Sequence, residues 1–228
     1  KAVDSLVFPQ SELDNKCKKV LLYKKWAGLY DFKPIKTHDI CYDINKRTEA
    51  INRKITENAI TVIKNNSGII PLKRLDTLNI ASLIIGDTLD EDFQEFIKKY
   101  GNIDIYELEK TPKKEKSDSI LKLLSKYNLV IVSMQKTHQL TTSNFGISKQ
   151  SIAIIDTLKK TKKIILNLPG NPYGLQNFKN LNNIESIVVS YQDNYFTKVF
   201  SAQVIFGGIP AIGVLPVGLS KDIPVNTS

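Results

Sequence analysis

Three short segments carry the residue types that could do chemistry. His138 follows the apolar run at residues 129–134 in a long polar stretch, and a loop imidazole can transfer protons near neutral pH. Ser117-Asp118 joins a hydroxyl to a carboxylate that could act as a nucleophile, but its position before a helical pattern favours a helix N-cap. Gly170-Asn171-Pro172-Tyr173 directly follows another apolar run and is typical of a strand-to-helix turn. For His138 the alternative is an exposed surface imidazole.

The motifs of common catalytic and nucleotide-binding sites are absent from the sequence. It contains no G-x-G-x-x-G, no G-x-x-x-x-G-K and no G-x-S-x-G pattern. The second histidine, His38, lies in a polar stretch, and we interpret it as a surface residue. Cys17 and Cys41 could pair, but two cysteines alone do not make a metal site. We therefore expect neither a metal nor a cofactor.

The net charge and the length of the chain indicate which classes of protein it can belong to. The net charge of +9 invites a nucleic-acid interpretation, but Arg47, Arg53 and Arg74 are the only arginines, and the lysine runs lack interleaved aromatic residues. A solvated lysine surface explains the charge, so we expect no nucleic-acid partner. The 228 residues suit one large domain, or one domain of about 150–200 residues plus an extension.

Neither a membrane-spanning apolar run nor a signal peptide is present in the sequence. Because the chain starts at Lys1, we expect a piece of a longer protein.

Two helical patterns open the chain. Residues 11–29 and 46–65 repeat apolar side chains at helical intervals, and we expect both helices to precede every strand. We divide the chain into a helical linker at residues 1–47 and an α/β domain at residues 48–228.

From residue 77 onward, apolar strands alternate with helices. Near-continuous apolar strands of this kind are typical of a parallel sheet that is covered on both faces. The sequence predicts a flavodoxin-like three-layer αβα sandwich with a mostly parallel sheet of about five to six strands. The expected strands lie at residues 79–85, 103–106, 129–134, 164–168 and 184–191.

Ligands of such sheets bind beyond the carboxyl ends of the strands. In this chain those ends lead into residues 86–90, 135–147, 169–173 and 191–195. The second of these loops is unusually long and polar, which is typical of lids and contact loops.

Several motifs resemble the second domain of glycoside hydrolase family 3, and their order along the chain is that of the family. Glu57 to Asn65 with Ile70-Pro71-Leu72 is similar to the entry into that domain, and Ala202-Gln203 through Phe206-Gly207-Gly208 to Gly213–Val217 is similar to its closing signature. The central loop motifs of the domain are matched by Phe145-Gly146-Ile147-Ser148 and Gly170-Asn171-Pro172-Tyr173. The helix that leaves the family's catalytic barrel is matched by Val20-Leu21 and Trp26-Ala27-Gly28-Leu29.

The resemblance implies a retaining glycoside hydrolase as the parent, with its nucleophilic Asp on a TIM-type barrel before Lys1. It also implies that the barrel is the partner of this chain and that carbohydrate is bound through the barrel. Bacterial relatives with this architecture are often exported, so the resemblance favours a periplasmic or exported protein. In the β-glucosidase branch the second domain supplies an acid/base Glu, but the strand-end loops contain no Glu before the following helix begins. The chain is therefore more similar to the β-N-acetylglucosaminidase branch, in which a barrel His has that role. We expect the isolated chain to be inactive.

As contacts to the substrate rim or to the barrel we predict polar and aromatic residues of the strand-end loops, with none of them catalytic. They are His138, Asn144, Phe145, Asn171, Tyr173 and Asp193. Two other functions remain open: a stand-alone flavodoxin-like module that binds a small ligand and, ranked last, a nucleic-acid binder.

Overall fold

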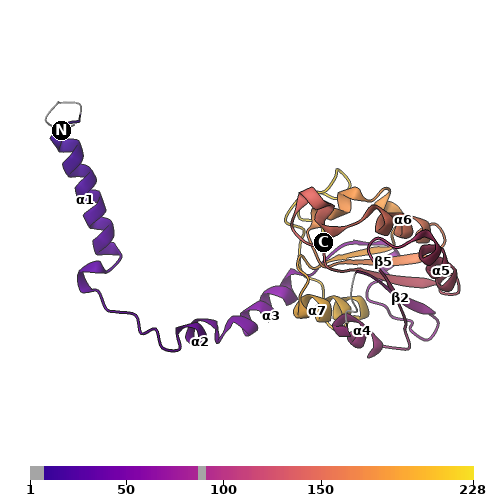
Figure 1. The fold of residues 1–228 in the computed structure, drawn as a ribbon. Helices are drawn as coiled ribbons and strands as arrows, with labels where there is room; N and C mark the ends of the chain where they lie inside the picture. The colour runs from indigo at the N-terminus through magenta and orange to yellow at the C-terminus, as the bar shows by residue number, and fades with distance from the viewer. Residues whose placement is uncertain (1–7, 87–90) are drawn as a thin grey trace. The chain divides into compact units, whose positions relative to one another are not determined.

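The computed structural model describes residues 8–86 and 91–228 (Figure 1). The chain divides after Arg47 into two compact units. The first unit contains α1 (Gln10–Trp26), η1 (Leu29–Asp31) and α2 (Ile40–Asn45). A helical segment therefore precedes the α/β unit, as predicted.

Helix α1 presents apolar side chains on more than one face. Leu13, Cys17 and Leu21 lie four residues apart along one face, as the sequence indicates. Trp26 lies on another face with 86% of its surface exposed, and no residue of α1 is buried. Among the described residues, no helix combines the length and the apolar character that crossing a membrane requires.

The second unit is built on one six-stranded sheet. Its strand order is β1-β6-β5-β4-β2-β3, in which only the edge strand β1 runs antiparallel to its neighbour. This mostly parallel sheet confirms the predicted architecture. The strands are β1 (Thr61–Asn65), β2 (Ile80–Ile85), β3 (Asp104–Leu108), β4 (Leu129–Met134), β5 (Lys163–Leu168) and β6 (Ser186–Val189).

Helices cover both faces of the sheet (Figure 1). Along β4, Val130 and Val132 pack in one buried cluster with α5 and α6, whereas Leu129 and Ile131 pack in another with α4 and α7. All four side chains are fully buried, which explains why the strand is apolar at successive positions. The helices of this unit are α3 (Thr48–Ala59), α4 (Glu91–Lys98), α5 (Lys114–Leu124), α6 (Lys149–Leu158) and α7 (Tyr195–Phe206). Short 3-10 helices are η2 (Asn66–Gly68), η3 (Thr141–Gly146), η4 (Pro172–Asn177) and η5 (Leu181–Asn183).

The predicted helix at residues 46–65 is wrong in its last part. Helix α3 ends at Ala59, and residues 61–65 form β1. Three β-branched residues in succession, Thr61, Val62 and Ile63, favour an extended backbone. Strand β1 pairs with β6, with Thr61 opposite Val189. Both opening helices still precede every strand, as predicted, but the second one ends earlier than expected.

The predicted N-cap at Ser117-Asp118 is also wrong. Helix α5 already begins at Lys114, and its N-cap Lys113 makes no side-chain capping bond. The Ser117 hydroxyl donates instead to the Lys113 carbonyl oxygen at 3.1 Å, as serines inside helices do. This pair is therefore part of a surface helix.

A buried tyrosine ties α5 to the edge strand β3. The Tyr127 hydroxyl donates to the Asp104 carboxylate and lies 2.7 Å from the Tyr106 hydroxyl. Burial, reinforced by the hydrogen bond to Asp104, raises the pKa of Tyr127 above its ordinary value near 10. The folded chain therefore keeps this proton at pH values at which the unfolded chain loses it.

This proton makes stability depend on alkaline pH. The contribution is complete below pH 10 and is lost as the pH rises above it, because the unfolded state then binds fewer protons. We expect Tyr127→Phe to flatten the fall in unfolding free energy above pH 10. At pH 7 it should cost about 0.5–1.5 kcal/mol, because the hydrogen bond to Asp104 is lost but water can solvate this exposed carboxylate. Urea denaturation between pH 7 and 11 measures both effects, with the exposed Tyr30→Phe as the control. An unchanged alkaline slope in Tyr127→Phe would contradict the assignment.

Candidate functional site

The candidate site lies at the carboxyl ends of three neighbouring parallel strands. Strand β4 leads into residues 135–147, β5 into residues 169–173 and β6 into residues 191–195. These are three of the four loops that the sequence singles out. Residues 87–90 of the fourth loop lie outside the described part of the chain.

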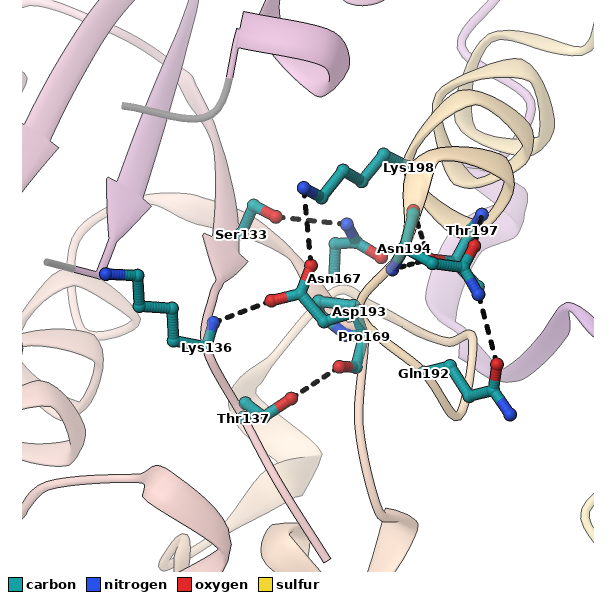
Figure 2. A network of polar contacts seen from close by, with 10 residues as sticks. All are labelled: Ser133, Lys136, Thr137, Asn167, Pro169, Gln192, Asp193, Asn194, Thr197 and Lys198. Carbon is teal, nitrogen blue, oxygen red and sulfur yellow. Dashed lines mark hydrogen bonds and ion pairs between the residues drawn. The ribbon is translucent and has the colours of Figure 1, made fainter. Parts of the chain in front are cut away.

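Asp193 is the central residue of this edge, as Figure 2 shows. Its Oδ2 accepts a hydrogen bond from the Lys136 backbone N–H at 2.7 Å. Its Oδ1 lies 3.5 Å from the Lys198 ammonium on α7, and the two side chains are only 17% and 21% exposed. The carboxylate therefore joins the loop after β4 to the helix after β6.

Further polar bonds connect the same loops. The Thr137 hydroxyl donates to the Pro169 carbonyl oxygen, and Gln139 Nε2 donates to the Tyr191 carbonyl oxygen at 3.3 Å. Asn171 Nδ2 donates to Gln139 Oε1 at 2.8 Å. Side chains thus connect the loop after β4 to the loops after β5 and β6. These hydrogen bonds fix the three loops relative to one another.

Gly170 is required where two of these loops approach. A Cβ at this position would clash with the Thr137 hydroxyl. Asn171 then caps η4, because its Oδ1 accepts the Tyr173 backbone N–H at 3.0 Å. The predicted strand-to-helix turn is confirmed, and the Tyr173 side chain remains 39% exposed.

His138 is held by its own loop. Its Nδ1 accepts the Leu140 backbone N–H at 3.2 Å, and its Nε2 lies 3.2 Å from the Ser143 hydroxyl. A neutral imidazole that accepts at Nδ1 carries its proton on Nε2, so it donates to Ser143 and cannot deprotonate it. The Ser143–His138 pair therefore lacks the tautomer of a nucleophile and its base. His38, in the first unit, is exposed, and its Nε2 lies 3.0 Å from Asp39 Oδ2.

The end of the long loop has an unusual backbone. Asn144, Phe145 and Gly146 all adopt positive φ, at 55°, 56° and 78°. Such conformations are rare for a bulky residue, and they cluster at functional sites. Asn144 Nδ2 donates to the Ile147 carbonyl oxygen at 2.6 Å. The Phe145 side chain is buried, so it anchors the loop to the domain.

Sequence reasoning missed a row of buried polar side chains beneath this edge. Asn167 on β5 lies opposite Ser133 on β4 and donates to its hydroxyl at 3.1 Å. Asn167 Oδ1, together with the hydroxyls of Ser190 and Ser201, has no hydrogen-bond partner among the described residues. The signal was a polar residue near the carboxyl end of two apolar strands, Ser133 in β4 and Asn167 in β5.

Carboxylates are scarce in the described part of the edge. Across residues 8–86 and 91–228, no cluster of His, Cys, Asp and Glu could hold a metal ion. Glu185 lies just before β6, at the opposite end of that strand from the loops. Asp193 is the one carboxylate in the strand-end loops at residues 135–147, 169–173 and 191–195. These three loops therefore lack the pair of carboxyl groups that most glycosidases use.

Exposed apolar side chains gather at this same edge of the sheet. Leu140, Tyr173 and Tyr195 follow the carboxyl ends of β4, β5 and β6 and are 63%, 39% and 52% exposed. Ile212 and Val214 are also exposed, and Gly213 between them donates its N–H to the Ile60 carbonyl oxygen before β1. Because β1 is antiparallel to β6, its start lies at this edge. An apolar surface among polar loops is typical of a site that contacts protein.

A cavity of about 720 Å³ opens elsewhere, beside β1 and the chain after α7. Two of its polar side chains bond within the protein: Lys64 donates to the Leu181 carbonyl oxygen, and Asn65 bonds both backbone groups of Ile70. These groups are not available to orient a small ligand, so the cavity adds little to the alternative of a ligand-binding module.

Solved structures share this fold. A glycoside hydrolase family 3 β-N-acetylglucosaminidase from Paenibacillus sp. str. FPU-7 matches 98% of the chain with 42% of its own, at 18% identity and a TM-score of 0.61. The β-glucoside phosphorylase BglX matches 97% with 41% of its own, at 18% identity and a TM-score of 0.66. A β-glucosidase from Listeria innocua matches 91% with 32% of its own, at 12% identity and a TM-score of 0.62. No family model and no curated protein matches the chain. The chain thus spans about two fifths of the length of the first two structures, and its fold occurs within enzymes of this family.

Proposed function

We propose that this chain is the C-terminal accessory domain of a family 3 glycoside hydrolase. One observation carries the proposal: the fold matches such enzymes over nearly all of this chain but over less than half of theirs. The missing part would be the TIM-type barrel that carries the nucleophile. Residues 1–47 would then be the linker from that barrel, and residues 48–228 the accessory domain.

The carboxyl edge of the sheet is the surface that we assign to the barrel. Hydrogen bonds between the loops fix the shape of this edge. Exposed apolar side chains such as Tyr195 and Ile212 provide apolar surface that a partner domain would bury. His138, Asn144, Asn171, Tyr173 and Asp193 belong to these loops. Phe145 belongs to the same loop, but its side chain is buried, so it packs inside the domain and does not lie on the surface of the edge.

The linker also fits a position inside a larger protein. Helix α1 carries exposed apolar residues on several faces, including Leu22 and Trp26. Apolar side chains on more than one face of a helix are typical of contact with protein on more than one side. In the parent we expect these side chains to be covered.

For the parent we propose retaining hydrolysis of terminal β-N-acetylglucosaminides. Retaining hydrolysis proceeds through a covalent glycosyl-enzyme intermediate, with a second group acting as acid and then base. The described edge of this chain offers no Glu for the second role, so we place both roles on the barrel. The chain would then shape the rim of the site and leave the chemistry to its partner.

The substrate is tested with chromogenic sugars. We expect the parent protein to hydrolyse β-N-acetylglucosaminide faster than β-glucoside, as judged by kcat/KM. A preference for the glucoside would contradict the proposed substrate and return attention to the β-glucosidase branch.

A further inference from the structure

Lys136, near the start of the long loop, adopts an unfavourable backbone conformation that other contacts must stabilise. Its φ is 50°, in the left-handed region that residues other than glycine rarely adopt. It follows Gln135, whose N–H still donates to the Ile85 carbonyl oxygen of the sheet, so the change of direction occurs within one residue of the strand end. The loop direction therefore depends on what holds Lys136.

Asp193 holds the backbone at this point. Its Oδ2 accepts the Lys136 N–H at 2.7 Å, a short bond with a charged acceptor, which is stronger than a neutral one. The carboxylate is itself fixed, because it is largely buried and its Oδ1 lies 3.5 Å from the Lys198 ammonium. Lys198 in turn belongs to α7, whose capping box at Asn194 and Thr197 fixes the first turn of the helix.

The residues after Lys136 form the exposed part of the edge. The Lys136 carbonyl oxygen accepts from the Lys110 ammonium at 2.6 Å, and Thr137 bonds to Pro169. Gln139 and Leu140 then reach the surface that we assign to the barrel. A rotation of the chain at Lys136 would displace all of them together.

We propose that Asp193 is a positioning residue that fixes the left-handed turn at Lys136 and so sets the shape of the loop at residues 136–147. Its role in activity rests on the proposed function, but the turn itself is a property of this chain. Asp193 acts through the backbone of another residue and takes no part in bond making or breaking.

Hydrogen exchange of the Lys136 amide in the full 228-residue chain tests the turn. We expect Asp193→Ala to accelerate this exchange about tenfold or more, with the β5 amides unchanged, because only the local opening becomes easier. Asp193→Asn keeps an acceptor oxygen and should give an intermediate rate. The matched control is Gln192→Ala, because Gln192 is exposed on the same loop and accepts only from Asn194 in the hydrogen bonds seen here.

An Asp193→Ala rate within about twofold of the wild type would overturn the proposal, since a held amide must exchange faster once released. If Asp193→Ala does not fold, Asp193→Asn decides: faster exchange confined to residues 135–147 supports the turn, and an unchanged rate overturns it.

Kinetic measurements on the parent enzyme distinguish a failure of this proposal from a failure of the proposed function. In the parent enzyme we expect Asp193→Ala to raise KM about fivefold or more with little change in kcat, because binding is lost and chemistry is retained. A parent without glycosidase activity would refute the proposed function and leave the exchange result standing. Faster exchange with unchanged KM would show that the turn exists but does not shape the substrate rim.

Discussion

Replacing Phe93 with alanine should lower the free energy of unfolding of the α/β unit by about 3–5 kcal/mol. Phe93 on α4 is fully buried in the cluster that joins α4 and α7 to the sheet. Truncation removes buried apolar surface and leaves a cavity between the sheet and its helices. The packed layers cannot move together enough to fill this cavity. Urea denaturation followed by far-UV circular dichroism measures the change.

The control for this prediction lies on the same helix. Phe96 is partly exposed, with the Lys99 ammonium 4.1 Å from its ring centroid. We expect Phe96→Ala to cost about 1 kcal/mol, because its side chain already meets water. Equal losses for the two variants would show that α4 does not pack on the sheet as described.

A lysine at Ile212 should leave the isolated chain intact but impair the parent enzyme. Ile212 is 59% exposed, so in the isolated chain we expect a stability change within about 0.5 kcal/mol. In the parent, the proposed barrel would cover this position, and a buried unpaired ammonium is costly. We therefore expect kcat/KM to fall about tenfold or more, or the domains to separate on limited proteolysis.

Leu123→Lys is the matched control for this second variant. Leu123 is 46% exposed on α5, which covers the sheet rather than following a strand end. The same substitution there should leave both the isolated chain and the parent unaffected. If Ile212→Lys and Leu123→Lys behave alike in the parent, the carboxyl edge is not the docking surface.

The parallel part of the sheet could be predicted because its signals are local. The strand at residues 129–134 is apolar at nearly every position, and burial on both faces follows from that pattern. The strand-to-helix turn at Gly170 and Asn171 was equally readable, because each residue has one favoured backbone role there.

Strand β1 could not be predicted from local pattern alone. Ile55, Ala59, Val62 and Ile63 continue a helical spacing into residues that are in fact extended. What decides their conformation is pairing with β6, more than 120 residues away in the chain. The helix start at Lys114 was missed for a different reason, because it lacks a capping side chain.

The position of the candidate site at one edge of the sheet could be predicted, but the hydrogen bonds between its loops could not. The rule for parallel sheets put His138, Asn171 and Asp193 at one edge, and the structure places their loops there. That Asp193 holds the Lys136 backbone and that His138 accepts from Leu140 depend on loop conformation, which no spacing reveals. The burial of Phe145 is a consequence of the same loop path.

The most direct test of the account compares the chain with its parent. Hydrolysis of a chromogenic β-N-acetylglucosaminide is measured for residues 1–228 alone and for the protein with its native upstream region restored. We predict that the activity of the longer protein exceeds that of the chain by roughly a hundredfold or more, because we place the nucleophile on the proposed barrel. Equal activity in the chain alone would contradict it and would mean that the loops at the carboxyl edge contain a complete site.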